Sequence, residues 1–402
     1  WTGFVLSSSN GLEKYPKLRF KGFSEPWKTD TLGNLGTFIK GAPLSKADIT
    51  DEGTPFVLYG ELYTTYGEVT HSIKRRTDKV VEPQFYSKVG DVIMPTSGET
   101  PEDIATASCI MLPDVILAGD LLIYRTQKVD GRLVSFVVKN KVNKQISSVA
   151  QGKSVVHVRA EELSKIAISY PSDAEQHKIL TMLELLEDKM SKQRELIEHL
   201  KKYKRGVSNT FFNDKVVAEC SAVLPFGQAV EINPKTKSLP TEFIYIDLES
   251  VESGKLLQEN IISHDNAPSR AQRVLTKGDV LFQMVRPYQK NNFYFESELS
   301  LPAVASTGYA QIRCVDNDPL FVFEQISSDY FANEAMLRST GTGYPAINAD
   351  SLAEIPFIKH PIEEQRKIGK FLYLLSQRII QEESKLEALL KVKGAMLQSL
   401  FI

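Results

Sequence analysis

The feature that most constrains this chain is an internal repeat. Residues 175–212 and 364–401 align without a gap at a constant offset of 189, with 12 identities in 38 positions. Each copy has the apolar spacing of a long amphipathic helix, and each closes one half of the 402-residue chain. A duplication of this kind predicts two similar halves related by a rough twofold axis. Such a protein suits a partner that itself has twofold symmetry, and duplex DNA is one.

Both helices have recognisable starts. Ser172 and Glu175 form a capping box directly after Pro171, and the second helix begins with Pro361 and acidic residues in its first turn. The segment from Ser172 to Phe212 contains 41 residues. At the helical rise per residue it would make a rod of about 60 Å.

Apolar residues recur in both helices at alternating intervals of three and four, which is typical of a coiled-coil seam. Gln193 and Lys204 interrupt the seam in the first copy, and Glu382 and Lys393 interrupt it at the equivalent positions of the second. We predict that the helices pair antiparallel, with Lys204 beside Glu382 and Lys393 beside Gln193. The seam residues expected to contact the other helix or a partner are Ile179, Leu183, Leu186, Leu200, Ile368, Leu372, Leu375 and Leu389.

The segments outside the helices have short β-branched or aromatic runs separated by Gly, Pro, Asn and Asp, which indicates mixed α/β domains. The repeat extends into them, because residues 90–93 match residues 278–281. The predicted fold class is α+β, with mixed α/β domains at residues 1–170 and 213–360. They are separated by two long antiparallel coiled-coil helices, residues 171–212 and 361–402, in a pseudo-twofold internal repeat. We expect the scaffold to be repeated and the exposed loops to differ.

The formal net charge of −2 hides local clusters. Residues 121–159 contain eight basic residues and one acidic residue, and further basic clusters lie at 74–79 and 270–290. An uneven field of this kind can still attract phosphate groups. No apolar run approaches the roughly 20 residues that span a bilayer, so we expect no membrane contact and a cytoplasmic location. Cys109, Cys220 and Cys314 lie far apart, which indicates neither a zinc site nor a disulfide framework.

The sequence contains no convincing catalytic pattern. Gly152–Ser154 resembles the end of a phosphate-binding loop but lacks the earlier glycine. The Gly-rich run 339–345 contains a proline and does not lead into a cofactor-binding unit, so we interpret it as a turn. The chain also lacks the Asn- or Asp-Pro-Pro-aromatic loop of an adenine methyltransferase, and none of its histidines is placed beside a Ser or Cys as a catalytic base would be. We therefore predict no catalytic and no metal-binding residues.

Taken together, these residues resemble the specificity (S) subunit of a type I restriction-modification system, over essentially the whole chain. The resemblance lies in the opening segment 16–23 with Trp27 and Leu32, and in the Glu-Gln-x-Lys-Ile motif after a proline at the start of each helix. The second copy reaches this motif one residue sooner after its proline, which only blurs the helix start. The resemblance implies two target-recognition domains that each read one half of a bipartite DNA site, with the helices as spacer and dock.

The resemblance also implies partners for a chain that is not an enzyme. Two methyltransferase (M) subunits, which carry S-adenosylmethionine, would pack against the helices, and restriction/translocase (R) subunits would join them. This chain itself would bind double-stranded DNA and no cofactor. The spacing of the half-sites would follow from helix length, so whole added turns should lengthen the DNA spacer.

Within each domain we expect basic side chains to hold phosphates and a few loop side chains to contact base edges. The candidates in the first domain are Lys74, Arg75, Arg76, Arg125, Lys128 and Arg132, with Thr96 and Ser97 as possible base readers. The candidates in the second domain are Arg270, Arg273, Gln283, Arg286, Tyr288, Lys290, Asn291 and Asn292. For each of them an ordinary solvated surface position is the alternative.

Two other functions stay open on the sequence. A stand-alone sequence-specific DNA-binding regulator would have to bind alone with useful affinity. A coiled-coil scaffold without a DNA role would fail to retain plain duplex in a filter-binding assay.

Overall fold

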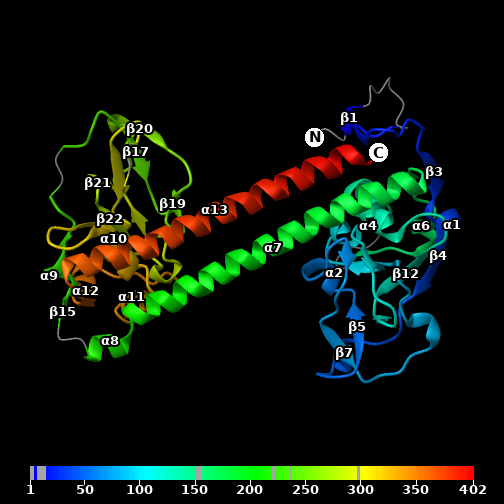
Figure 1. Ribbon diagram of the computed structural model, residues 1–402, viewed down its shortest axis with the longest axis horizontal. Coiled ribbons are helices and arrows are strands. Elements are labelled where there is room, and N and C mark those ends of the chain that lie inside the picture. Colours follow the sequence, from blue (N-terminus) through cyan, green and yellow to red (C-terminus); the bar gives the residue numbers. More distant parts are fainter. Residues whose placement is uncertain (1–3, 7–14, 151–155, 220–221, 236–237, 297–298) are drawn as a thin grey trace. The chain divides into compact units, whose positions relative to one another are not determined.

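The computed structural model describes residues 4–6, 15–150, 156–219, 222–235, 238–296 and 299–402. Gly152–Ser154 and Cys220, considered above, lie outside these ranges. The chain divides into two compact units, Trp1–Ser191 with Glu387–Ile402, and Lys192–Leu386. Each unit holds a mixed α/β globule together with parts of both long helices (Figure 1). The predicted mixed α/β class is confirmed, while the domain boundaries at residues 170, 212 and 360 stay predictions.

The two repeated helices are α7 (Asp173–Phe211) and α13 (Ile362–Leu400), each 39 residues long. In the first unit the beginning of α7 and the end of α13 share one core, where Ile179 is buried with Leu400. In the second unit the end of α7 and the beginning of α13 share another, where Phe212 is buried with Leu372. The helices are therefore antiparallel in each unit, as predicted (Figure 1). No helix in the described part of the chain has the length and apolar content needed to cross a membrane.

The predicted register of the helix pair is wrong. Gln193 Nε2 donates a hydrogen bond to Glu382 Oε2 at 2.6 Å, so two positions separated by the repeat offset contact each other. Lys204 lies about three turns, or roughly 16 Å, further along α7 and cannot reach Glu382 from there. Its Nζ instead pairs with Glu324 Oε2 at 2.8 Å.

Lys393 likewise pairs with a carboxylate of the globule in its own unit, the first. Its Nζ pairs with Glu68 Oε2 at 3.1 Å and also contacts Glu187 of α7, not Gln193. Glu324 and Glu68 are both buried, and a buried carboxylate left without a cation would be costly. Each seam lysine therefore compensates a carboxylate of the globule in its own unit.

The core of the first unit lies between α4 (Gly131–Asn140) and a five-stranded sheet of order β4-β12-β8-β10-β6. Its strands are β4 (Gly36–Lys40), β12 (Leu121–Thr126), β8 (Asp91–Pro95), β10 (Ser108–Ile110) and β6 (Val69–Thr70). A second sheet has the order β11 (Ile116–Ala118), β5 (Thr54–Leu58) and β7 (Arg75–Thr77). Shorter elements are β1 (Phe4–Leu6), β2 (Leu18–Phe20), β3 (Lys28–Thr31), α1 (Leu32–Leu35), α2 (Glu61–Thr64), β9 (Ser97–Gly98), α3 (Pro101–Ile104), α5 (Asn143–Val149), β13 (Val156–His157), α6 (Ala160–Ser164) and β14 (Ala167–Tyr170).

The second unit repeats this plan with two four-stranded sheets. One has the order β16 (Glu231–Ile232), β25 (Tyr309–Arg313), β22 (Val280–Gln283) and β23 (Phe293–Tyr294), and the other β20 (Ile261–Ser263), β17 (Glu242–Ile246), β24 (Ala303–Ser306) and β21 (Ala271–Val274). The parallel pair of β17 with β24 corresponds to that of β5 with β11. The remaining elements are α8 (Asp214–Glu219), β15 (Val223–Pro225), α9 (Phe226–Ala229), β18 (Val251–Glu252), β19 (Lys255–Leu256), α10 (Pro319–Ile326), α11 (Asp329–Leu337), α12 (Ala349–Ala353) and β26 (Pro356–Ile358).

The repeated glutamine of the Glu-Gln-x-Lys-Ile motif joins each long helix to its globule. Gln176 Oε1 accepts the backbone N–H of Asp130 at 3.0 Å, and Asp130 caps α4. Gln365 Oε1 accepts the backbone N–H of Asp318 at 2.9 Å, and Asp318 caps α10. Both glutamines are buried, so each contact satisfies polar groups that water cannot reach.

The glutamate of the same motif forms a buried ion pair in the first unit and lies exposed in the second. Glu175 accepts two hydrogen bonds of 2.8 Å from Arg19, and the side chains are 1% and 5% exposed. Its repeat equivalent, Glu364, is more than half exposed and lies 3.4 Å from His360. The bidentate pair therefore fixes the N-terminal segment of the first unit to the start of α7.

We expect Arg19→Met to destabilise the first unit by about 3 kcal/mol, because it leaves the buried Glu175 carboxylate without its cation. Urea unfolding followed by circular dichroism measures this. Lys21→Met, which removes a charge from an exposed neighbouring position, is the control and should change stability little. Equal unfolding midpoints for the two variants would contradict a stabilising role for the pair.

Candidate nucleic-acid interface

Arg125, at the end of β12, is held inside the first unit. Its Nε donates to Asp91 Oδ2 at 3.1 Å, and its Nη2 donates to two backbone carbonyl oxygens. The second unit has the same pair at an offset of 188, where Arg313 Nη2 donates to Asp279 Oδ2 at 2.8 Å. The hydrogen bond with Asp279 raises the pKa of Arg313. Because the pair is repeated and both carboxylates are buried, Arg125 has a structural role.

Arg132, in the first turn of α4, is also paired within the first unit. It bonds Asp130 at 2.7 Å and Glu184 of α7 at 2.8 Å, and these bonds, above all those to Asp130, raise its pKa. Arg132 therefore ties α4 to α7. Lys128 is different, since its side chain is exposed and Nζ donates to the carbonyl oxygen of Asn34 at 3.0 Å.

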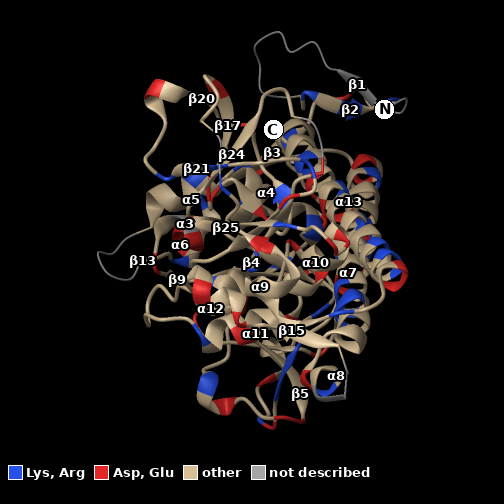
Figure 2. Ribbon diagram, turned by 90° about the vertical axis from the view of Figure 1, so that its left-hand side faces the viewer, with Lys and Arg blue, Asp and Glu red and all other residues tan. Residues whose placement is uncertain are grey.

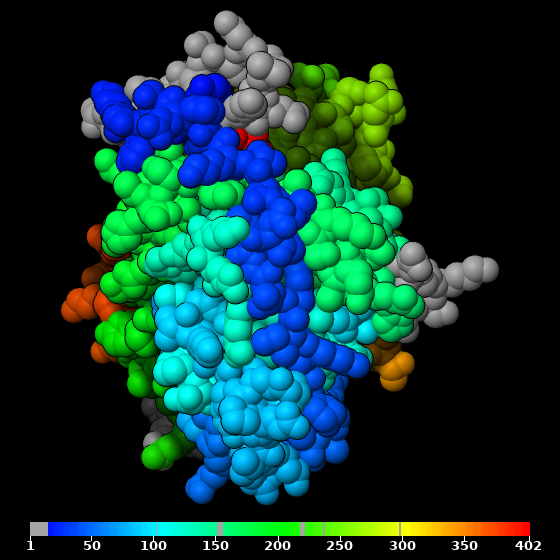
Figure 3. Space-filling model, turned by 90° about the vertical axis from the view of Figure 1, so that its right-hand side faces the viewer, coloured from blue at the N-terminus to red at the C-terminus, as the bar shows by residue number. Residues whose placement is uncertain are grey.

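The edge strand β7 exposes a basic pair. Arg75 points inward and its Nε pairs with Glu61 Oε1 at 2.9 Å. Lys74 and Arg76 are exposed and, two residues apart along an extended segment, lie on one face. Arg76 Nη1 also donates to the carbonyl oxygen of Gly53 at 2.8 Å. The segment that carries them, light blue in Figure 3, lies in the lower part of that view of the first unit.

The structure does not expose the base readers expected in the first domain. Ser97 is 6% exposed, its Oγ lies 3.0 Å from His157 Nδ1, and its carbonyl oxygen accepts the Tyr63 hydroxyl at 2.6 Å. Thr96 is half-buried, and its carbonyl oxygen accepts the N–H of Val158 at 3.1 Å. Both residues are occupied in the packing between β9 and β13.

In the second unit, Gln283 and Asn292 support a loop instead of facing solvent. They are 2% and 1% exposed. Gln283 Oε1 accepts the N–H of Asn291 at 3.0 Å, and Gln283 Nε2 donates to Gln289 Oε1 at 2.8 Å. Asn292 Oδ1 accepts the N–H of Gln283 at 2.9 Å. These buried amides hold the loop 284–291 in place from the interior of the second unit.

The loop presents Arg286 in a defined position. Arg286 has a φ of 54°, and its N–H donates to the carbonyl oxygen of Pro345 at 2.7 Å. Its guanidinium carbon lies 4.2 Å from the centre of the Tyr344 ring, and Tyr344 is 71% exposed. The Tyr344 ring covers one side of the guanidinium, and Nε is buried without a hydrogen-bond partner, which leaves the terminal N–H groups to pair with O6 and N7 of guanine. Tyr288, on the same loop, is also exposed.

Tyr344 was missed in the sequence, where the run 339–345 was interpreted as a turn. It is a turn, because Thr340 and Ala346 exchange two backbone hydrogen bonds of 2.9 Å. The sequence did contain a signal for Tyr344, namely an aromatic residue among glycines. A large aromatic side chain at a turn is exposed, so it is available to stack on a neighbouring side chain.

The remaining candidates of the second unit fall into two groups. Lys290 and Asn291 belong to the loop that carries Arg286. Lys290 Nζ pairs with Asp329, and Asn291 Oδ1 accepts the N–H of Ser253 at 3.2 Å. Arg270 and Arg273 lie on or beside β21 in the other sheet. Arg270 is exposed, whereas Arg273 is half-buried, which lowers its pKa.

The long helices show mixed charge and exposed apolar residues. Basic and acidic residues are interspersed along the ribbons of α7 and α13 in Figure 2, so we place the candidate interface on the loops. Leu185 and Leu374, equivalent in the repeat, are 65% and 56% exposed, and Tyr203 and Phe371 are exposed too. Within the described ranges, no three His, Cys, Asp or Glu side chains are grouped as metal ligands would be.

A family model matches the first half of the chain. Residues 24–202 match the type I restriction modification DNA specificity domain. The type I restriction enzyme MjaVIII specificity subunit of Methanocaldococcus jannaschii is 21% identical over 96% of this chain and 95% of its own length. The type I restriction enzyme EcoDI specificity subunit of Escherichia coli is 22% identical, over 56% of this chain and 58% of its own.

Solved structures are similar over nearly the whole chain. The S subunit of a type I restriction-modification system from M. genitalium matches with a TM-score of 0.66 at 18% identity, covering 96% of this chain and 99% of that chain. A chain from a type I R-M system, studied for its complex assembly and conformational transition, matches with a TM-score of 0.51 at 18% identity, covering 93% and 98%. At these identities the likeness is one of fold.

If Arg286 reads a base, as we predict, Arg286→Ala should weaken binding to the preferred duplex by about 1–3 kcal/mol and leave binding to unrelated duplexes unchanged. Selection from a random duplex library, followed by fluorescence anisotropy on the selected site, measures both. Arg366→Ala is the control, since it removes the same charge from an exposed position on α13. An equal loss on every duplex would make Arg286 a phosphate contact.

Proposed function

We propose that this chain, which is a type I restriction-modification specificity subunit, binds duplex DNA and reads one half of a bipartite site with each unit. The observation that carries this proposal is the contrast between repeated interior contacts and exposed loops that are not repeated. The glutamine links and the Arg–Asp pairs recur in both units. A shared scaffold with unlike loops suits two unlike half-sites, because loops carry binding residues on a rigid support.

In this proposal, some contacts position the protein on the duplex and others read the base sequence. Lys74, Arg76 and Lys128 of the first unit contact phosphates, since they keep exposed basic ends. Arg286 of the second unit contacts a guanine edge, supported by its stack on Tyr344 and by the buried amides beneath the loop. The cationic groups raise affinity for any duplex, and Arg286 selects among sequences.

The chemistry is assigned to partners. Two M subunits would hold S-adenosylmethionine and methylate adenine, and R subunits would carry translocation and cleavage. The apolar side chains exposed on the helices support a docking role for α7 and α13. Leu185 and Leu374 are exposed at equivalent positions of the repeat, which suits two copies of one partner. In the same proposal the length of the helices sets the DNA spacer.

Co-expression with the methyltransferase subunit encoded beside this chain tests the proposal. Mapping methylated adenines across a genome at single-base resolution should give one bipartite motif with a fixed spacer. The methyltransferase expressed without this chain is the control and should leave that motif unmodified. Methylation scattered without a motif, or a single uninterrupted motif, would contradict reading by two units.

The double substitution Leu185→Glu with Leu374→Glu should weaken capture of the M subunit by about tenfold or more per site, because it places charge in an apolar contact. Size-exclusion chromatography with light scattering gives the stoichiometry. His199→Glu with Ala388→Glu is the matched control, since these positions are also exposed and separated by 189. Full assembly by the leucine variant would move the docking surface elsewhere.

A further inference from the structure

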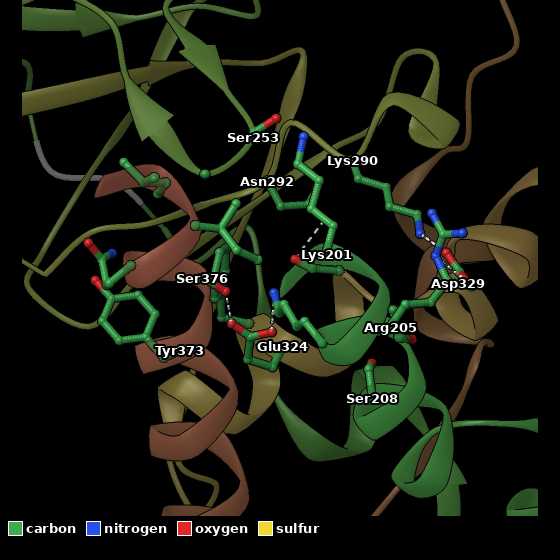
Figure 4. Close-up of a pocket in the computed structure, with 18 of the residues that line it drawn as sticks. Lys201, Arg205, Ser208, Ser253, Lys290, Asn292, Glu324, Asp329, Tyr373 and Ser376 are labelled. Atoms are coloured by element: carbon green, nitrogen blue, oxygen red, sulfur yellow. Dashed lines mark hydrogen bonds and ion pairs between the residues drawn. The ribbon is translucent and has the colours of Figure 1, made fainter. Parts of the chain in front are cut away.

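A cavity of about 340 Å³ lies in the second unit beside α7 (Figure 4). Its walls come from the last turns of α7, the junction of α10 with α11, the β18–β19 turn, the loop 284–291 and α13. Hydroxyl groups of Ser208, Ser253 and Ser376 are among its lining groups. The cavity therefore adjoins the same loop that presents Arg286, on the side of the long helices.

Positive charge exceeds negative charge in this cavity. Four basic side chains, Lys201, Lys204, Arg205 and Lys290, line it against two carboxylates, Glu324 and Asp329. Lys204 is committed to Glu324, which is 1% exposed and also accepts a hydrogen bond from Ser376.

Asp329 has to serve two cations. Lys290 bonds one of its oxygens, and Arg205 Nε lies 3.6 Å from the other. The hydrogen bond from Lys290, opposed by partial burial, lowers the pKa of Asp329, so the carboxylate is ionised at neutral pH. Lys201 pairs at 2.9 Å with Glu383 of α13, where both side chains are partly exposed. After these pairings Arg205, 72% exposed, is the least satisfied cation lining the cavity.

Backbone strain is concentrated at the same place. Five non-glycine residues in the described ranges have a positive φ. Ser253 (50°) and Lys290 (54°) line the cavity, and Arg286 (54°) lies on the same loop 284–291 as Lys290. Such conformations cost roughly 1–3 kcal/mol each and persist where the surroundings hold them, which is common at binding sites.

We propose that this cavity binds one phosphate group of the DNA backbone, with Arg205 as its main cation. The inference rests on the proposed DNA-binding function and adds a site to it. A phosphodiester carries one negative charge and several acceptor oxygens, which match the weakly paired Arg205 guanidinium and the hydroxyl groups of Ser208 and Ser253 in the walls. Arg205 can pair with the phosphate while Lys290 keeps Asp329 neutralised, so no carboxylate is left facing the anion alone.

The chain limits where this phosphate lies. Lys290 follows Arg286 by four residues, which span at most about 14 Å of extended chain. That distance corresponds to about four base pairs of rise along the duplex. The phosphate is therefore expected near the guanine that Arg286 contacts, at a distance set by this segment and by the reach of the Arg286 and Arg205 side chains.

Neutral methylphosphonate linkages, placed one at a time along a duplex with the selected site, test the proposal on the full chain with its M subunit. One position near the Arg286 contact should weaken wild-type binding by about fivefold or more and Arg205→Gln binding by less than about twofold. Arg205→Gln should also reduce the slope of log K against log salt by about one on every duplex. Lys202→Gln is the matched control, because Lys202 is a neighbouring exposed lysine of α7 that does not line the cavity.

The outcomes separate the two claims. If Arg205→Gln and Lys202→Gln have the same salt slope and the same methylphosphonate profile, the phosphate site is wrong while two-unit reading stands. If Arg205→Gln alone lowers the slope but the chain shows no bipartite preference, the phosphate site stands and the reading proposal fails. If the assembled complex binds no duplex, both are wrong.

Discussion

Each long helix depends on one buried glutamine at its start. Gln176 and Gln365 accept the N–H of the aspartate that caps α4 or α10, so the first turn of the long helix is bonded to the cap of a helix in the globule. An apolar seam alone would let a helix slide or rotate, because hydrophobic contact is not directional. A buried amide allows one position, since a shift would leave two polar groups unsatisfied. In each unit the position of the long helix is therefore set by its hydrogen bond to the globule. The apolar seam residues pack in the arrangement that this bond allows.

The same constraint explains what the sequence could and could not predict of the fold. The repeat and its spacing predicted two long helices, and their ends agree with α7 and α13 within about two residues. The register failed because the polar residues of the seam were assumed to compensate one another. Lys204 and Lys393 instead reach Glu324 and Glu68, which lie far away in sequence. Periodicity carries no information on a partner outside the helix, so the pairing could not be found from the helices alone.

The candidate site was predicted by charge, and charge does not separate a structural arginine from an exposed one. Arg125 and Arg132 stand in the most basic stretch of the chain, yet both are paired with carboxylates inside the first unit. The repeat held a usable signal for Arg125, because Arg313 stands at the equivalent position of the second half and pairs with the aspartate of the repeated Gly-Asp motif. A basic residue present in both halves is a scaffold candidate, and one found in a single half is a candidate for recognition. Arg286 meets the second condition, whereas its stack on Tyr344 required the structure.

The loop 284–291 combines rigidity with exposure in a way that composition could not predict. Buried Gln283 and Asn292 hold its backbone from the inside, while Arg286 is half-buried against Tyr344 and Tyr288 is exposed. An arginine on a flexible loop would lose side-chain and backbone freedom on binding a base, and that loss would subtract from its affinity. Here the ordering is complete before binding, because the amides, the Pro345 hydrogen bond and the Tyr344 ring already fix its position. The packing of the second globule therefore stabilises one loop conformation. Substitutions of the buried residues that support the loop should alter sequence selection although those residues do not contact DNA.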